Sequence, residues 1–171
     1  MSNSHGIVVT GIGATTPVGG DATSSWLAIK AGQSGIASLP YEWAGDLPVR
    51  FGGVLAVSPA EVLDRVEARR LDRSQQTALL ASREAWADAG SPEVDPVRIG
   101  TVVGTGIGGV ITLLDAYDVL KERGPSRISP HTVPMLMPNG PAAVVGLDHH
   151  AAAGVHAPVS ACASGAEAVA W

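Results

Sequence analysis

Cys162 is the residue of this sequence best suited to covalent chemistry, and it is the only cysteine among 171 residues. It follows an apolar segment and precedes Ala163–Ala166, whose small side chains suit a tight turn from a strand into a helix. Backbone N–H groups at a helix start stabilise a thiolate by about 0.3–1 kcal/mol and form half of an oxyanion hole. Because a cysteine thiol is mostly protonated at pH 7, this placement favours a nucleophile. The alternative is that Cys162 is a small buried apolar side chain.

The segment Gly104–Gly109 matches the pattern G-x-G-x-x-G between an expected strand and an expected helix. In dinucleotide-binding domains this pattern brings the backbone close to a pyrophosphate, and an acidic residue about 20 residues further on binds the ribose. Glu122 lies near that distance, but it belongs to a charged helix end and not to the end of a second strand. The pattern therefore also fits a tight strand-to-helix turn that binds no cofactor, and we favour this interpretation.

The histidines lack the spacing of a metal site or of a base for Cys162. His149 and His150 are adjacent, so on a helix their side chains diverge by about 100° and do not bind one ion together. His156 precedes Cys162 on the same expected strand, at roughly 20 Å when the chain is extended. We therefore expect no metal, no cofactor and no base for Cys162 within this sequence.

Two further groups of side chains have ordinary structural explanations. Leu136 lies between Met135 and Met137 in a flexible apolar patch, which is typical of a core and, less often, of a channel for a long acyl chain. Charged residues near position 70 are expected to form one solvent-exposed face of mixed charge, made of Asp64, Glu67, Arg69, Arg70, Asp72 and Arg73.

Alternating strands and helices must position these residues. Short apolar runs predict three buried strands, namely Ile7–Thr10, Arg98–Val103 and Val155–Ala161. Helical spacing, capping residues and terminal glycines predict helices from Asp21 or Thr23 to Ala31, from Ser58, from Ser74 to Ala89, from the Gly104–Gly109 loop to Lys121, over Ala142–Leu147 and from Ser164 to Trp171. Residues 34–57 are expected to be loop with one short strand near Val49–Gly53, and the proline-rich stretch 129–141 to hold only a brief helix. This alternation predicts an α/β fold with a mainly parallel sheet.

Composition excludes several classes of protein. Apolar residues make up 46% and charged residues 16%, which provides enough apolar surface for a folded core. The net charge of −5 argues against a nucleic-acid binder. No apolar run approaches the ~20 residues that span a bilayer, and Met1–His5 show no feature of a signal peptide. A single cysteine excludes an internal disulfide, which suits a cytoplasmic protein.

Several segments together resemble the β-ketoacyl-acyl-carrier-protein synthases, condensing enzymes of fatty-acid elongation with a thiolase-like fold. They follow the family's order and spacing across nearly the whole chain: Ile7–Gly13, Ala31–Ile36, Gly100–Gly109, Ser129–Pro130, Met137–Asn139 and Val159–Gly165. Val159–Gly165, which follows the other segments in the family's order, is the segment most specific for this family. The segments most similar to ketosynthases of the mycolic-acid branch, which elongate very long acyl chains, are Gly90–Pro96, Met137–Gly140 and Ser164–Ala168.

The resemblance implies roles for individual residues. Cys162 corresponds to the nucleophile that takes the acyl group as a thioester, with its own backbone N–H as one oxyanion donor. Ile107 corresponds to the apolar gate of the acyl pocket, Ala161 to the pocket wall beside the nucleophile, and Leu136 to a residue that faces the acyl chain. The strand Val155–Ala161 resembles the one that pairs with its twin in a homodimer. An acyl carrier protein is the implied partner, carrying the acyl and malonyl thioesters.

The resemblance also implies which part of an enzyme this chain represents. Residues 1–171 correspond to the N-terminal portion of a ketosynthase domain, one half of a thiolase-like fold with a mainly parallel or mixed five-stranded sheet and flanking helices. The family's catalytic histidines and lysine follow the cysteine well downstream. We therefore expect this chain to be capable of accepting an acyl group on Cys162 but not of decarboxylative Claisen condensation with malonyl-carrier protein.

Three alternatives stay open at this point. One is a dinucleotide-binding α/β domain that uses Gly104–Gly109. Another is a non-enzymatic half-fold that binds a carrier protein or a longer subunit. The third is a chain-initiating synthase or a thiolase with the same cysteine turn, although Ser129–Pro130 and Met137–Asn139 favour the elongating synthases.

Overall fold

The computed structural model describes residues 6–171, which divide into two compact units. Unit 1 comprises the chain up to Val57 together with Ala81–Pro92, and unit 2 comprises Ser58–Leu80 together with Glu93–Trp171. The segment Met1–His5, in which no signal peptide is expected, lies outside the described residues. None of the helices in 6–171 combines the length and apolar character that a membrane-spanning helix needs.

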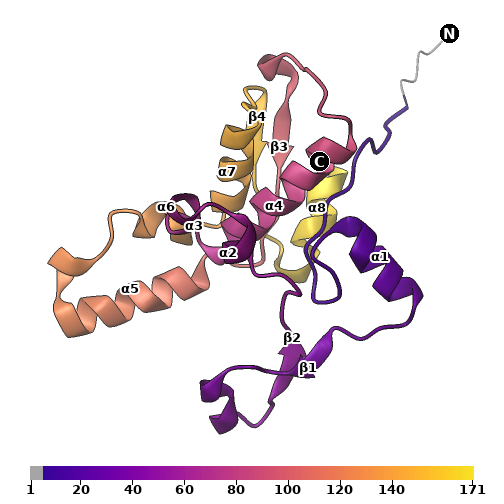
Figure 1. Cartoon of the computed structure of the whole chain (residues 1–171). Helices are drawn as coiled ribbons and strands as arrows, with labels where there is room; N and C mark the ends of the chain where they lie inside the picture. Colours follow the sequence, from indigo (N-terminus) through magenta and orange to yellow (C-terminus); the bar gives the residue numbers. More distant parts are fainter. Residues whose placement is uncertain (1–5) are drawn as a thin grey trace. The chain divides into compact units, whose positions relative to one another are not determined.

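Unit 1 contains a capped helix, a two-stranded sheet and the second half of a longer helix. Its elements are α1 (Ala22–Lys30), β1 (Ile36–Ser38), η1 (Glu42–Asp46), β2 (Phe51–Gly53) and part of α4 (Arg73–Asp88), all placed along the chain in Figure 1. Helix α1 begins as predicted, because Asp21 accepts a hydrogen bond from the Ser24 backbone N–H at 2.6 Å and the Ser24 hydroxyl accepts one from Asp21 in return. It ends before Gly32, whose φ of +68° suits glycine.

The sheet of unit 1 lies in the stretch where the sequence predicts loop with one strand. β1 and β2 pair antiparallel, with Ile36 opposite Gly53. The strand expected near Val49–Gly53 is confirmed as β2, whereas β1 and η1 have no counterpart in the sequence-based prediction. Strands of three residues are too short to show the period-two alternation by which a strand is identified.

The predicted strand Ile7–Thr10 does not form, and its apolar side chains are exposed. For the residues just after Ile7–Thr10, acidic side chains of α4 accept the backbone hydrogen bonds that a neighbouring strand would otherwise accept. The Ile12 backbone N–H donates to Asp88 at 2.9 Å. The Ala14 backbone N–H donates to Glu84 at 2.8 Å. A β-branched run becomes a strand only where another strand lies beside it, and within 6–171 this segment has no such neighbour.

Unit 2 contains a two-stranded parallel sheet and a helix that covers it. Strand β3 (Gly100–Val102) pairs with β4 (Gly154–His156), and α7 (Gly140–Asp148) packs against both strands (Figure 1). At Gly146 of α7, an added Cβ would lie 2.7 Å from the Val155 side chain. Glycine therefore lets this helix approach the sheet closely.

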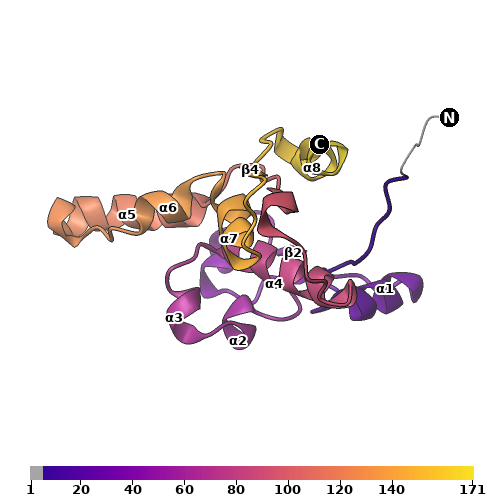
Figure 2. The same ribbon diagram turned by 90° about the horizontal axis from the view of Figure 1, so that it is seen from above.

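Further helices and turns complete unit 2. They are α2 (Pro59–Val62), α3 (Arg65–Ala68), the first half of α4, η2 (Pro96–Arg98), α5 (Val110–Arg123), η3 (Pro125–Arg127), α6 (Thr132–Leu136), η4 (Ala161–Ala163) and α8 (Ser164–Ala170). Helices α5 and α6 lie side by side (Figure 2). The helices predicted at α2, α4, α5, α7 and α8 are confirmed, and α6 is the brief helix predicted within 129–141.

The strands of unit 2 are shorter than the sequence predicts. The expected strand Val155–Ala161 ends at His156, and the chain continues without regular structure to the turn η4. The described residues form two two-stranded sheets in place of the expected five-stranded sheet. Apolar composition makes a segment suitable for a sheet, but only backbone pairing with a neighbour makes it a strand.

A buried polar cluster joins the start of α4 to α5. Asp72 is only 6% exposed, and its carboxylate accepts hydrogen bonds from the Ser74 backbone N–H at 2.8 Å and the Ser74 hydroxyl at 2.7 Å. It also accepts one from the Thr112 hydroxyl at 2.7 Å. The expectation that Asp72 belongs to a solvent-exposed charged face is therefore wrong, because hydroxyl and N–H donors replace water around this carboxylate.

Gln75 extends the cluster to α6. Its amide oxygen accepts a hydrogen bond from the Asp72 backbone N–H at 3.0 Å, and its amide nitrogen donates to the Pro134 carbonyl at 2.8 Å. Its side chain also fills the space beside Gly140, where an added Cβ would lie 2.2 Å from Nε2. The start of α4 is thus fixed to the segment that carries Leu136.

The cluster makes the stability of this fold depend on pH. Burial raises the pKa of the Asp72 carboxyl, but the hydrogen bonds from Ser74 and Thr112 outweigh burial and hold this pKa below its ordinary value. A carboxyl whose pKa is lower in the folded than in the unfolded chain stabilises the fold at neutral pH. That contribution is lost as the pH falls through the folded-state value.

Asp72→Asn is expected to lower the free energy of unfolding by about 2 kcal/mol at neutral pH, because each hydrogen bond to a charged acceptor contributes about 1.5–3 kcal/mol. The loss should begin to shrink below about pH 4, the ordinary value of an aspartate, and should disappear only as the pH falls through the lower pKa of Asp72 in the folded chain. Urea unfolding at neutral pH and in acid measures both values, with Asp118→Asn at an exposed position of α5 as the control. An equal loss at both pH values would show that the charge of Asp72 does not stabilise the fold.

Candidate functional site

The chain turns sharply between β4 and α8, and Cys162 lies on this turn. Ala161 adopts a φ of +50°, a left-handed conformation that a residue with a Cβ rarely takes. Cys162 follows it in η4 and is exposed. The left-handed conformation costs roughly 1–2 kcal/mol, so surrounding contacts must hold it. Exposure of Cys162 excludes the alternative of a buried structural cysteine.

Hydroxyl groups hold the backbone of this turn. Ser164, the first residue of α8, is 2% exposed. Its Oγ accepts a hydrogen bond from the Ser160 backbone N–H at 2.8 Å and donates to the Ala161 carbonyl at 2.7 Å. The Ser160 hydroxyl donates to the carboxylate of Glu167. The two bonds of the Ser164 hydroxyl satisfy backbone groups that have no strand partner here.

The segment Gly104–Gly109, the glycine loop, lies against the turn. An added Cβ at Gly104 would lie 2.2 Å from the Ser164 carbonyl oxygen, so the two backbones are in direct contact. The Ser164 hydroxyl also lies 3.0 Å from the Thr105 carbonyl, to which it donates. The loop that follows β3 and the turn that precedes α8 are therefore packed together within unit 2.

The glycine loop also contacts the end of α6 and the residues after it. The Thr105 hydroxyl donates to the Pro138 carbonyl at 3.0 Å. The Gly109 backbone N–H donates to the Leu136 carbonyl at 3.1 Å. Three segments that are distant in the sequence thus adjoin one another through the glycine loop.

The four residues that the sequence singles out lie on these adjoining segments. Cys162 and Ala161 are exposed on the turn, Ile107 is 66% exposed on the glycine loop, and Leu136 is half-buried at the end of α6. Their expected roles as nucleophile, pocket wall, gate and acyl contact stay predictions. The close contact at Gly104 explains the lack of a side chain there without any cofactor.

Sequence reasoning missed the residues that join these segments. Ser164 and Thr105 supply the connecting hydroxyls, and each lies among small residues that give no hint of a distant partner. The one available signal is that Thr105 lies within Gly104–Gly109 and Ser164 within Val159–Gly165, two of the segments that carry the family resemblance. His156, expected to be too far from Cys162 to act as its base, stacks on Trp171 with ring centroids 5.1 Å apart.

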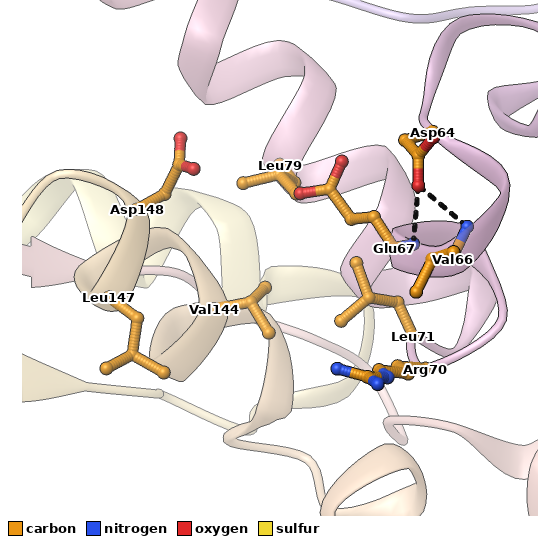
Figure 3. A pocket seen from close by; sticks show the side chains of 9 residues that line it. All are labelled: Asp64, Val66, Glu67, Arg70, Leu71, Leu79, Val144, Leu147 and Asp148. Atoms are coloured by element: carbon orange, nitrogen blue, oxygen red, sulfur yellow. Dashed lines mark hydrogen bonds between the residues drawn. The ribbon is translucent and has the colours of Figure 1, made fainter.

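A separate pocket of about 550 Å³ lies in unit 2 among α3, the start of α4 and α7. Its lining combines apolar and charged side chains: Asp64, Val66, Glu67, Arg70, Leu71, Leu79, Val144, Leu147 and Asp148. Figure 3 shows Glu67 and Asp148 on opposite sides of the space. None of the four predicted site residues lines this pocket, so it is distinct from the cysteine turn.

Comparison with known proteins identifies the family. A family model described as beta-ketoacyl synthase, N-terminal domain, matches residues 4–171. The chain belongs to this family. A solved beta-ketoacyl synthase from Burkholderia phymatum is similar to this chain with a TM-score of 0.73 and 28% identity, over 95% of this chain and 41% of that one. The ishigamide ketosynthase/chain length factor shares the fold at a TM-score of 0.81 and 21% identity, over 95% of this chain and 46% of that one.

These similarities confirm the expected α/β, thiolase-like fold, of which this chain forms the N-terminal half. The 3-oxoacyl-[acyl-carrier-protein] synthase 2 of Mycobacterium bovis is 48% identical over 166 residues, which are 96% of this chain and 40% of that protein. The protein of the same name from Staphylococcus aureus is 37% identical over 172 residues, 99% of this chain and 42% of that one. This chain thus spans about two-fifths of the length of the curated relatives it matches.

Gly104→Ala is expected to lower the free energy of unfolding by about 1–3 kcal/mol, because the new Cβ would overlap the Ser164 carbonyl and force the backbones apart. Gly165→Ala in α8 is the matched control. Nothing lies within 4 Å of its added Cβ, so we expect it to be neutral or stabilising by about 0.5–1 kcal/mol. Urea unfolding followed by circular dichroism measures both. A neutral Gly104→Ala would contradict the close contact of loop and turn.

Proposed function

We propose that the protein to which this chain belongs is a β-ketoacyl-acyl-carrier-protein synthase, an acyltransferase that extends an acyl chain by decarboxylative Claisen condensation. The observation that carries this proposal is the exposed Cys162 on a left-handed turn that the glycine loop holds in place. Membership of the beta-ketoacyl synthase family over residues 4–171 supports it. So do the names of the mycobacterial and staphylococcal relatives, which are 3-oxoacyl-[acyl-carrier-protein] synthases.

The residues of this chain perform the acyl-accepting step. The thiolate of Cys162 attacks the carbonyl carbon of an acyl thioester, so that a carbon–sulfur bond forms and negative charge passes to the carbonyl oxygen. The backbone N–H of Cys162 stabilises this oxyanion. When the intermediate collapses, the thiolate of the carrier leaves and takes up a proton, and the acyl group stays on Cys162.

The condensing step needs residues from elsewhere in the protein. A malonyl thioester loses CO₂, and its carbanion attacks the acyl carbon on Cys162, so that a carbon–carbon bond forms and the Cys162 thiolate leaves. In the family that the sequence resembles, histidines downstream of the cysteine polarise the malonyl carbonyl and stabilise the enolate. No histidine or lysine follows Cys162 in this sequence. We therefore assign residues 1–171 to the N-terminal portion of the ketosynthase domain, which accepts an acyl group without condensing it.

The acyl chain is placed by the residues around the turn. Ile107 acts as the gate, Ala161 forms the wall beside the sulfur, and Leu136 faces the chain. The adjoining positions of the turn, the glycine loop and the end of α6 support this assignment. Met135 and Met137 on either side of Leu136 adapt to substrates of different shape. Resemblance to the mycolic-acid branch favours very long acyl chains.

The proposal also assigns a partner and a compartment. An acyl carrier protein delivers the acyl and malonyl thioesters. The names of the relatives, which are 3-oxoacyl-[acyl-carrier-protein] synthases, support a carrier protein as the partner. A single cysteine, which forms no internal disulfide, suits an enzyme of the reducing cytoplasm.

Incubation of the 171-residue chain with the octanoyl thioester of N-acetylcysteamine is expected to add one octanoyl group, located on Cys162 by mass spectrometry of peptides. Cys162→Ala is expected to add none, because no other thiol is present. Further addition of malonyl-carrier protein should yield no β-ketoacyl product from the chain, although a full-length relative yields one under the same conditions.

Two outcomes would contradict the proposal. Equal labelling of Cys162→Ala would show that the acyl group goes to another residue. Condensation by the 171-residue chain at a rate comparable with the full-length relative would refute the assignment of the second step to residues outside it.

We propose a homodimer formed through Val155–Ala161, which the resemblance implies and which the exposure of Val155 and Val159 supports. Val159→Asp is expected to convert the dimer into a monomer, because burial of a carboxylate in an apolar interface is costly. Light scattering at several concentrations measures the mass. Val169→Asp, at a position 90% exposed on α8, is the control and should leave the dimer intact. A monomeric wild-type chain would refute this interface.

A further inference from the structure

Ser164 is a buried polar residue in an otherwise exposed stretch of unit 2. It is 2% exposed, whereas Ala161–Ala163 before it and Gly165 and Ala166 after it are exposed. A buried serine hydroxyl is stable only where hydrogen-bond partners replace water. The partners of this hydroxyl therefore indicate what it does.

The Ser164 hydroxyl bonds to backbone groups of two segments that are distant in the sequence. It accepts a hydrogen bond from the Ser160 N–H at 2.8 Å. Its oxygen lies 2.7 Å from the Ala161 carbonyl and 3.0 Å from the Thr105 carbonyl, and these two acceptors share its single hydrogen. The first two contacts span Cys162, from Ser160 and Ala161 before it to Ser164, the second residue after it. The third ties the turn to the glycine loop.

The link continues from the glycine loop to the end of α6. The Thr105 hydroxyl donates to the Pro138 carbonyl at 3.0 Å, so the two hydroxyls connect the turn, the loop and the segment after Leu136 in series. Direct contact between the backbones of Gly104 and Ser164 limits movement of the turn against the loop. The position of the thiol is thus coupled to that of Ile107.

We propose that Ser164 is a positioning residue, whose hydroxyl fixes the turn that presents Cys162 and holds this turn against the glycine loop that carries Ile107. The inference rests on the proposed function, in which Cys162 accepts the acyl group. Without the hydroxyl, the Ser160 N–H and the carbonyls of Ala161 and Thr105 lose a partner. The left-handed conformation of Ala161 is then free to relax, and the thiol and the Cys162 N–H no longer keep one geometry.

Two reactions of Cys162 separate positioning from stability. Acyl transfer passes through a tetrahedral oxyanion and needs the thiol and an N–H donor in a fixed arrangement. Alkylation by iodoacetamide needs only an accessible thiolate. The ratio of the two rates therefore reports on geometry, whereas partial unfolding changes both rates.

The test compares the wild-type chain with Ser164→Ala and with a control, Asp64→Ala. Asp64 caps α3 in the same unit by accepting a hydrogen bond from the Val66 N–H at 2.8 Å, a contact that involves neither the turn nor the glycine loop. Ser164→Ala is expected to slow acylation by octanoyl-N-acetylcysteamine about tenfold or more, while alkylation changes less than about threefold. Asp64→Ala is expected to leave the ratio of the two rates unchanged.

Amide hydrogen exchange tests the link without any acyl donor. Ser164→Ala is expected to speed exchange in residues 157–166 and in the glycine loop, and to leave β3 and α7 unchanged. Asp64→Ala should speed exchange in neither the turn nor the loop.

Each remaining outcome decides the question. An unchanged ratio of acylation to alkylation in Ser164→Ala, or unchanged exchange in both segments, would overturn the proposal. So would a variant that unfolds as a whole, because the hydroxyl would then serve the stability of the unit and not the turn alone. A wild-type chain that accepts no octanoyl group refutes the proposed function, and the exchange experiment then decides the positioning role by itself.

Discussion

The backbone of Gly104 lies against the backbone of Ser164 so closely that no side chain fits between them. This contact fixes the exit from β3 relative to the entry into α8, and the hydrogen bond from Ser164 to Thr105 fixes their orientation. The candidate site depends on both, because the Cys162 thiol and Ile107 lie on the two segments that meet there. A sequence with 21 glycines and one phenylalanine builds its site from backbone contacts and hydroxyl groups in place of aromatic bulk.

The sequence predicts the helices of this fold well, because capping residues and apolar spacing lie within the helical segment itself. The cap at Asp21 and the apolar spacing that ends before Gly90 locate α1 and α4 to within a residue or two. Strands depend on a neighbour. Ile7–Thr10 has the composition of a buried strand, but the N–H groups just beyond it donate to Asp88 and Glu84 and not to another strand.

The residues of the candidate site likewise differ in whether the local sequence or a distant partner determines their role. Cys162 is recognisable from its own surroundings, since small residues on both sides mark a tight turn. Ser164 is not recognisable in this way, because its role depends on the Thr105 carbonyl, which only the folded chain brings near. Asp72 shows the converse error: a run of charged residues predicts an exposed face, yet donors from Ser74 and Thr112 allow this one carboxylate to be buried.

The glycine pattern shows why a motif identifies a geometry and not a ligand. Gly104 and Gly109 lie where another group approaches the backbone more closely than a Cβ permits. In dinucleotide-binding domains that group is a phosphate. Here the space beside Gly104 holds the Ser164 carbonyl, and an added Cβ at Gly109 would lie 2.3 Å from the Met135 carbonyl. Because both approaches are made by the chain's own backbone, the close packing of the loop fixes the turn and the end of α6 in place. Ile107 of the same loop stays 66% exposed.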